Sequence, residues 1–107
     1  MKKVRLAQNI LYGSAGNTVN VNVNGYVYIK GTVSFLENYA TTSWGAEVAV
    51  EKIGDWDISI YITGQKNDTK MFYLPIGFLN IGDVITIMIP AYTTIAFEVY
   101  AEVDELS

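Results

Sequence analysis

Apolar and polar residues alternate with a period of two along most of the chain. In WDISIYIT (residues 56–63) every second residue is tryptophan or isoleucine, and polar residues and a tyrosine stand between them. The run TTIAFEVYAEV (93–103) shows the same pattern. Successive side chains of a strand point to opposite faces, so each such run predicts a β-strand with one buried face. The predicted strands are 4–11, 18–23, 26–36, 46–53, 56–63, 70–79, 83–89 and 94–103.

Turn-forming residues separate these runs, and they fix the fold class. Gly, Asn and Asp recur in YGSAGN (12–17), NG (24–25), GQKNDT (64–69) and NIGD (80–83). Short strands separated by turns about every ten residues are typical of an all-β antiparallel sandwich or barrel. Gly31 interrupts its strand and predicts a bulge or bend. The predicted core has one inward face per strand: Ile58, Ile60, Ile85, Ile87, Ile95, Phe97 and Val99.

Composition removes several classes of function. The 107 residues carry a net charge of −4, which disfavours nucleic acid as a partner. Cys and His are both absent, so no disulfide, thiol chemistry or usual zinc site is expected. No apolar stretch is long enough for a membrane helix. Polar residues interrupt the start MKKVRLAQNI early, so we interpret it as a first strand and expect no signal peptide.

Four pieces of the sequence, in order, resemble the jelly-roll superfamily of tumour necrosis factor and the complement globular heads. They are Gly25–Tyr28 at the start of a long strand, Lys52–Gly54 in a hairpin, Leu79–Ile85 before the penultimate strand, and the final strand Thr94–Val103. The resemblance spans residues 18–103. It implies a single-domain β-sandwich of jelly-roll topology over residues 1–107, with 1–3 and 104–107 as flexible ends. It also implies a homotrimer, and small stand-alone members suggest a phage or bacterial protein.

Aromatic residues at outward positions favour self-assembly. Either Tyr26 and Tyr28 or Val27 and Ile29 face outward, and further outward positions are also apolar. Such a composition is typical of interface cores. The resemblance implies that the sheet with the first, fourth, sixth and last strands lines a threefold axis. The fallback is the sheet that presents Tyr61 and Met88. The predicted interface residues are Tyr73, Tyr100, Ala96 and Ala49. Glu98 and Glu102 share this face, where Lys70 or Lys52 at the rim would pair with them.

These features predict a non-enzymatic structural or adhesive protein of a virion or cell surface, such as a phage decoration, fibre-head or receptor-contacting protein. Its partners would be copies of itself, other virion or surface proteins, and glycans. It would be made in the cytoplasm and act on a virion or an extracellular surface.

The alternative is a carbohydrate-binding module that uses aromatic residues in loops. Tyr39 and Trp44 lie in ENYATTSWG (37–45), which has little strand pattern, and Tyr92 lies in another turn. Exposed aromatic rings stack on sugars, although Trp44 could instead close the end of the sandwich.

No cofactor, metal site or catalytic residue is predicted. Asp55, Asp57 and Asp68 are possible calcium ligands, but a role in turns is favoured because no other acidic residue is close in sequence. Asp83 is expected to cap its turn. Glutamates on an outward strand face, such as Glu98 and Glu102, lack the cleft that glycosidase carboxylates need.

Overall fold

The computed structural model describes residues 2–36 and 46–104. Within them the chain forms eight strands at the predicted places. They are β1 (Lys2–Tyr12), β2 (Gly16–Asn20), β3 (Gly25–Phe35), β4 (Ala46–Lys52), β5 (Trp56–Ile62), β6 (Thr69–Leu79), β7 (Val84–Met88) and β8 (Thr93–Val103). The second strand lies slightly earlier than the predicted 18–23, because Val21 already bonds to the turn at Gly82 and Asp83.

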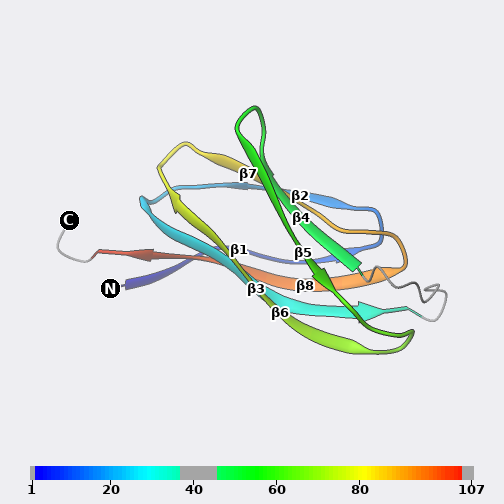
Figure 1. Cartoon of the computed structure of the whole chain (residues 1–107). Coiled ribbons are helices and arrows are strands. Elements are labelled where there is room, and N and C mark those ends of the chain that lie inside the picture. The colour runs from blue at the N-terminus through cyan, green and yellow to red at the C-terminus, as the bar shows by residue number, and fades with distance from the viewer. Residues whose placement is uncertain (1, 37–45, 105–107) are drawn as a thin grey trace.

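The strands form two four-stranded antiparallel sheets that pack face to face, which confirms the predicted all-β sandwich (Figure 1). One sheet has the order β1-β8-β3-β6, and the other has the order β2-β7-β4-β5. This order contradicts the expectation that the first, fourth, sixth and last strands share a sheet. The fourth strand, β4, instead pairs with β5 and β7 in the opposite sheet.

Alternating β-branched and aromatic side chains from both sheets fill the space between the layers. Ile85, Ile87, Ile95 and Val99 are fully buried, and Phe97 is nearly so, as predicted. Ile58 and Ile60 point inward but are only half-buried, in contrast to the prediction. The reason is that β5 is the edge strand of its sheet, so its side chains have neighbours on one side only.

A bulge between β3 and β6 replaces the irregularity that was predicted at Gly31. Gly31 pairs regularly with Phe72, whereas the register shifts between Val27 and Tyr28, opposite the unpaired Ile76. Gly77, next to the bulge, has a φ of 120°, a conformation that side chains of L-residues rarely adopt. The extra residue reverses the alternation of β6, so residues after it point to the opposite face from the one that the sequence pattern indicates.

Acidic residues in the loops stabilise turns, as expected. Asp83 Oδ2 accepts the backbone N–H of Asn80 at 2.7 Å, and Asp68 Oδ2 accepts that of Gln65 at 2.9 Å. Such side-chain bonds mimic a backbone turn. No helix among the described residues is long and apolar enough to cross a membrane.

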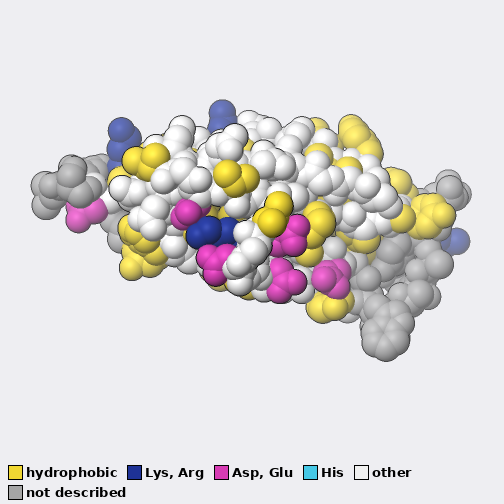
Figure 2. Space-filling model, turned by 90° about the horizontal axis from the view of Figure 1, so that it is seen from above, with side chains coloured by type: hydrophobic (Ala, Val, Ile, Leu, Met, Phe, Trp, Pro, Cys, Tyr) yellow, Lys and Arg dark blue, Asp and Glu magenta, His cyan; other side chains and the backbone are white. Residues whose placement is uncertain are grey.

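The outer face of the β2-β7-β4-β5 sheet carries mixed polar and charged side chains. Acidic groups gather there around a basic one, with small separate apolar spots (Figure 2). Lys52 Nζ lies 3.2 Å from Asp55 Oδ2 and 3.3 Å from Asp83 Oδ1, and so connects the β4–β5 hairpin to the β6–β7 turn. Tyr61 stands opposite Glu47 on the neighbouring strand.

Candidate functional site

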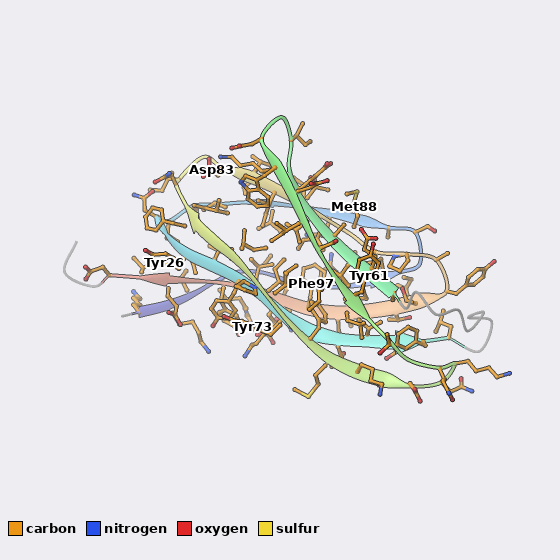
Figure 3. All side chains as sticks on the ribbon, viewed as in Figure 1. Tyr26, Tyr61, Tyr73, Asp83, Met88 and Phe97 are labelled. Atoms are coloured by element: carbon orange, nitrogen blue, oxygen red, sulfur yellow. The ribbon has the colours of Figure 1, made fainter. Side chains whose placement is uncertain are left out.

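Five aromatic side chains of β3, β6 and β8 lie close together on the outer face of the β1-β8-β3-β6 sheet. We call this set the aromatic face; its members are Tyr26, Tyr28, Tyr73, Phe78 and Tyr100. Figure 3 shows Tyr26 and Tyr73 on the side of this sheet that faces away from the other sheet, with Phe97 between the layers. More than half of each side chain of Tyr26 (58%), Tyr73 (57%) and Phe78 (52%) is exposed, and Tyr28 and Tyr100 are half-buried.

The rings contact one another across three strands. Tyr28 on β3 lies between Tyr73 on β6 and Tyr100 on β8, with centroid distances of 5.3 Å and 5.7 Å. The Tyr28 and Tyr100 rings are stacked at an angle of 26°. Tyr26 and Phe78 form an edge-to-face pair at 5.2 Å. These distances are those of favourable aromatic pairs, so the rings hold one another in place and form a preformed apolar surface.

The bulge in β6 makes this arrangement possible. It brings Phe78 opposite Tyr26 and Pro75 opposite Tyr28. Without the extra residue, Phe78 would have the same parity as the buried Phe72 and Leu74 and would point into the core. Pro75 is tolerated because β6 is an edge strand, where one side of the backbone needs no ladder partner.

Charged groups of both signs surround Tyr100. Lys3 Nζ lies 4.6 Å and Lys30 Nζ 5.0 Å from the centroid of its ring. The Tyr100 hydroxyl donates a hydrogen bond to Glu98 Oε2. Arg5 pairs with Tyr100 in the β1–β8 register. Cations over an aromatic ring are attracted by its quadrupole, so these side chains hold the ring from several directions.

The electrostatics keep the two central phenols protonated. The hydrogen bond to Glu98, followed by burial, raises the pKa of Tyr100 above its ordinary value of 10.0, and Arg5 opposes this shift. Burial, followed by the negative charge of Glu102, raises the pKa of Tyr28. Both hydroxyls are therefore neutral at physiological pH. The Tyr28 hydroxyl can donate to a polar ligand, whereas that of Tyr100 already donates to Glu98.

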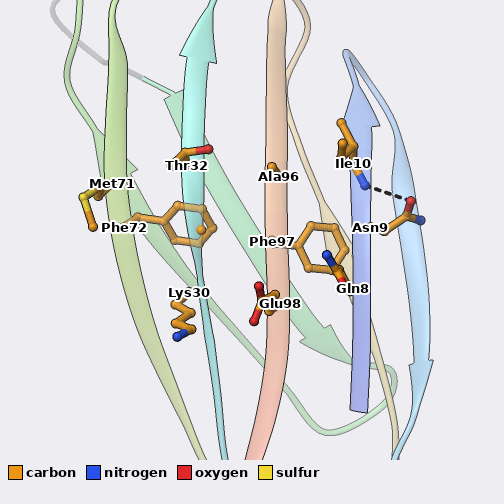
Figure 4. A pocket seen from close by; sticks show the side chains of 11 residues that line it. Gln8, Asn9, Ile10, Lys30, Thr32, Met71, Phe72, Ala96, Phe97 and Glu98 are labelled. Carbon is orange, nitrogen blue, oxygen red and sulfur yellow. Dashed lines mark hydrogen bonds between the residues drawn. The ribbon is translucent and has the colours of Figure 1, made fainter. Parts of the chain in front are cut away.

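A shallow hollow of about 410 Å³ adjoins the aromatic face (Figure 4). Its wall is formed by outward side chains of all four strands: Gln8 and Ile10 of β1, Lys30 and Thr32 of β3, Met71 of β6, and Ala96 and Glu98 of β8. The backbone of Gly31 contributes to its floor. The hollow contains none of the tyrosines, but Lys30 and Glu98 border both it and the Tyr100 ring.

The structure brings together three of the four predicted interface residues. Tyr73, Tyr100 and Ala96 share the outer face of the β1-β8-β3-β6 sheet, whereas Ala49 lies on β4 in the other sheet. Lys52, a predicted partner of the glutamates on this face, pairs instead with Asp55 and Asp83.

The predicted loop residues lie apart from the aromatic face or cannot be placed. Tyr39 and Trp44 are outside the described residues. Tyr92 is exposed and has a φ of 61° in the turn before β8. It precedes Tyr100 by eight residues, or roughly 25 Å along an extended strand.

Sequence reasoning missed Phe78 and left the orientation of Tyr26 and Tyr28 open. The pattern in YLPIGF offered the signal for Phe78, because a proline and a glycine two residues apart on one strand indicate an edge and a bulge. No group of three or more acidic, His or Cys side chains in residues 2–36 and 46–104 could hold a metal ion.

Comparisons with known proteins give one similar structure. Neither a family model nor a curated protein sequence matches the chain. The chain is similar to the carbohydrate-binding module CBM6cm-2 of lichenase 5A from Cellvibrio mixtus, solved in complex with cellotriose. The sequences are 12% identical, the match covers 96% of this chain and 98% of the other, and the TM-score is 0.46.

Two expectations from the sequence differ from what these comparisons found. The expected membership of the tumour necrosis factor and complement superfamily is corrected: no family model matches the chain, and the similar structure is described as a carbohydrate-binding module. The expected role as a structural virion or surface protein, which was inferred in part from that superfamily, is corrected with it. Self-association stays a prediction. The fold class stands independently of the match, since the strand order of the two sheets establishes it.

Proposed function

We propose that the protein is a carbohydrate-binding module without catalytic activity, and that the aromatic face is its binding site. The observation that carries this proposal is the contact of Tyr28 with Tyr73 and Tyr100 across three strands on the outer face of one sheet. This site differs from the loop platform that the sequence indicated.

The chemistry of the face suits a sugar. One side of a pyranose ring presents C–H groups and packs on an aromatic ring, while its hydroxyls extend sideways and need hydrogen-bond partners. On this face the rings supply the apolar surface, and Lys3, Lys30 and Glu98 stand beside the Tyr100 ring as donors and an acceptor. Apolar surface with a few polar groups at its border is the usual composition of a small-molecule site.

Binding without catalysis follows from where the carboxylates lie. Glu98 accepts a hydrogen bond from Tyr100, and the next carboxylate along the same strand face is Glu102. Both therefore lie on the same face of one strand. A glycosidase needs two carboxyl groups on opposite sides of the bond that it cleaves.

Affinity electrophoresis in gels that contain soluble neutral polysaccharides tests the proposal. Xylan, hydroxyethyl cellulose, galactomannan and laminarin are suitable probes. We expect at least one of them to retard the wild-type protein, and we expect Tyr73→Ala and Tyr28→Ala to abolish most of the retardation. Loss of a central contact ring should cost more than about 1 kcal/mol of binding free energy.

The matched control is Tyr61→Ala, which removes a tyrosine of similar exposure (61%) from the outer face of the other sheet. It should migrate as the wild type does. Equal retardation of all four proteins, or no retardation by any probe, would reject the aromatic face as a carbohydrate site.

A further inference from the structure

The hollow and the aromatic face form one continuous surface. Lys30 and Glu98 line the hollow, Lys30 also reaches the Tyr100 ring, and Glu98 accepts its hydroxyl. Tyr100 in turn stacks on Tyr28. A ligand on the tyrosines would therefore have the hollow directly beside it, along the direction of β3.

Small residues create the hollow in the middle of the sheet. Ala96 and Thr32 are cross-strand neighbours, and both point outward. Gly31 lies so close to β8 that an added Cβ would overlap the carbonyl oxygen of Ala96. The larger and well-exposed Ile10 (52%) and Met71 (86%) stand at the two sides. The result is a channel floored by backbone and small side chains, with an apolar wall on each side.

The charges on this surface are nearly balanced. In the β-sheet register Lys30 stands opposite Glu98, and Lys3 stands opposite Glu102. Of the charged groups named on this face, only Arg5 has no carboxylate opposite it, because its partner is Tyr100. Gln8 and Thr32 add uncharged donors and acceptors in the hollow. Such a surface offers hydrogen bonds to hydroxyl groups without the excess of positive charge that an anionic ligand needs.

The length of the surface is larger than one sugar. From Tyr26 to Thr32 along β3 the face extends over six residue steps, roughly 20 Å. We propose that the ligand is an extended, uncharged polysaccharide whose chain runs along β3, with sugar units on the tyrosines and following units in the hollow. This inference rests on the proposed function and adds the length and the charge of the ligand.

Isothermal titration with a series of neutral oligosaccharides, from disaccharide to hexasaccharide, tests the length. The series is taken from whichever polysaccharide retards the wild-type protein. For the wild type we expect affinity to rise about tenfold over the series, a difference of about 1.4 kcal/mol. Ala96→Trp should fill the hollow and remove this gain while leaving disaccharide affinity unchanged. Gln8→Trp is a second variant that fills the hollow. Gln8 is exposed on the edge strand β1, where a large side chain destabilises the fold least.

The matched control is Ala49→Trp, which places the same side chain on a half-buried alanine of the opposite sheet and should keep the full gain. Disaccharide binding with no dependence on chain length, or an undiminished gain in both hollow variants, would overturn the extended ligand while the proposed function stands. Tighter binding of polygalacturonate than of any neutral polysaccharide would overturn its lack of charge. Failure of every glycan to bind, with formation of a dimer in light scattering, would reject the proposed function itself.

Discussion

Gly31 is required because β3 lies directly against the backbone of β8 at this position. A Cβ at this position would overlap the carbonyl oxygen of Ala96 and lie 2.9 Å from the Cα of Phe97. Both obstacles belong to the backbone of a central strand, which cannot move without breaking its ladder. We therefore expect Gly31→Ala to lower the free energy of unfolding by about 1–3 kcal/mol in urea denaturation.

Gly16→Ala is the control for this substitution. Gly16 also lies in a strand, but a Cβ there would meet nothing closer than 3.5 Å. Its effect should stay within about 0.5 kcal/mol. Equal stability of the two variants would show that β3 and β8 are not so close at Gly31.

Two tyrosines on opposite faces each bond to a glutamate, and this allows a paired test. The hydrogen bond that Tyr100 donates to Glu98 raises the pKa of Tyr100, and the hydrogen bond to Glu47 raises the pKa of Tyr61. Replacing either glutamate with glutamine removes the negative charge that disfavours the phenolate. We expect Glu98→Gln to lower the pKa of Tyr100 toward 10.0 without affecting Tyr61, and Glu47→Gln to do the reverse. NMR titration of labelled tyrosine rings measures both, and a shift of the wrong tyrosine would contradict the assigned pairs.

The orientation of most side chains follows from alternation alone, since Phe97, Ile85 and Ile87 are buried as expected. Phe78 is the exception that matters for function. Alternation places it in the core with Phe72 and Leu74, and a single unpaired residue, Ile76, reverses it. A bulge depends on how β6 pairs with β3, and that pairing joins residues far apart in the sequence.

At the scale of elements, Lys52 joins two turns through Asp55 and Asp83. The backbone N–H of Asn80 and then Lys52 lower the pKa of Asp83 below its ordinary value of 3.8. A carboxyl group whose pKa is lowered in the folded state stabilises the fold at pH values above its ordinary pKa. This stabilisation is lost as the pH falls through the lowered pKa. Hydrogen bonds to Asp55 and then Asp83 raise the pKa of Lys52 above its ordinary value of 10.5. The stabilisation by Lys52 is therefore fully present below pH 10.5 and is lost as the pH rises through the raised pKa.

We expect Asp83→Asn to lower the melting temperature at neutral pH, and the difference from wild type to shrink in acid below pH 3.8. Thermal denaturation at both pH values measures it. Lys52→Met and the double variant complete a double-mutant cycle, which isolates the energy of the Lys52–Asp83 ion pair. The turn hydrogen bond is kept in Asp83→Asn, because the side-chain oxygen of asparagine can still accept the backbone N–H of Asn80. A difference that persists unchanged in acid would mean that the carboxylate charge contributes nothing.

Strand positions were predictable from the sequence, and sheet membership was not. Alternation and turn residues are local, so all eight strands appear near their predicted bounds. The assignment of β4 came from a family resemblance, and β4 in fact lies between β7 and β5. That error grouped Ala49 with Tyr73 and Tyr100, which lie in the other sheet. The aromatic face required the pairing of β3 with both β6 and β8, which no local pattern specifies.

At the scale of the whole molecule, the two outer faces differ in kind. One carries the stacked tyrosines and the hollow, and the other carries Lys52 with its acidic neighbours. This difference predicts that a glycan binds on one face only. Tyr92 lies on neither face, because it stands in the turn between β7 and β8.

Mapping a bound glycan by amide chemical shifts is the most direct test of this account. The protein, labelled with ¹⁵N, is titrated with an oligosaccharide of the polysaccharide that retards it. We predict that the largest shifts occur on β3, β6 and β8 around Tyr28, Tyr73 and Tyr100, and that they extend to Thr32 and Ala96. Shifts centred on Tyr61 of the opposite sheet, or on the turn of Tyr92, would contradict the aromatic face as the binding site.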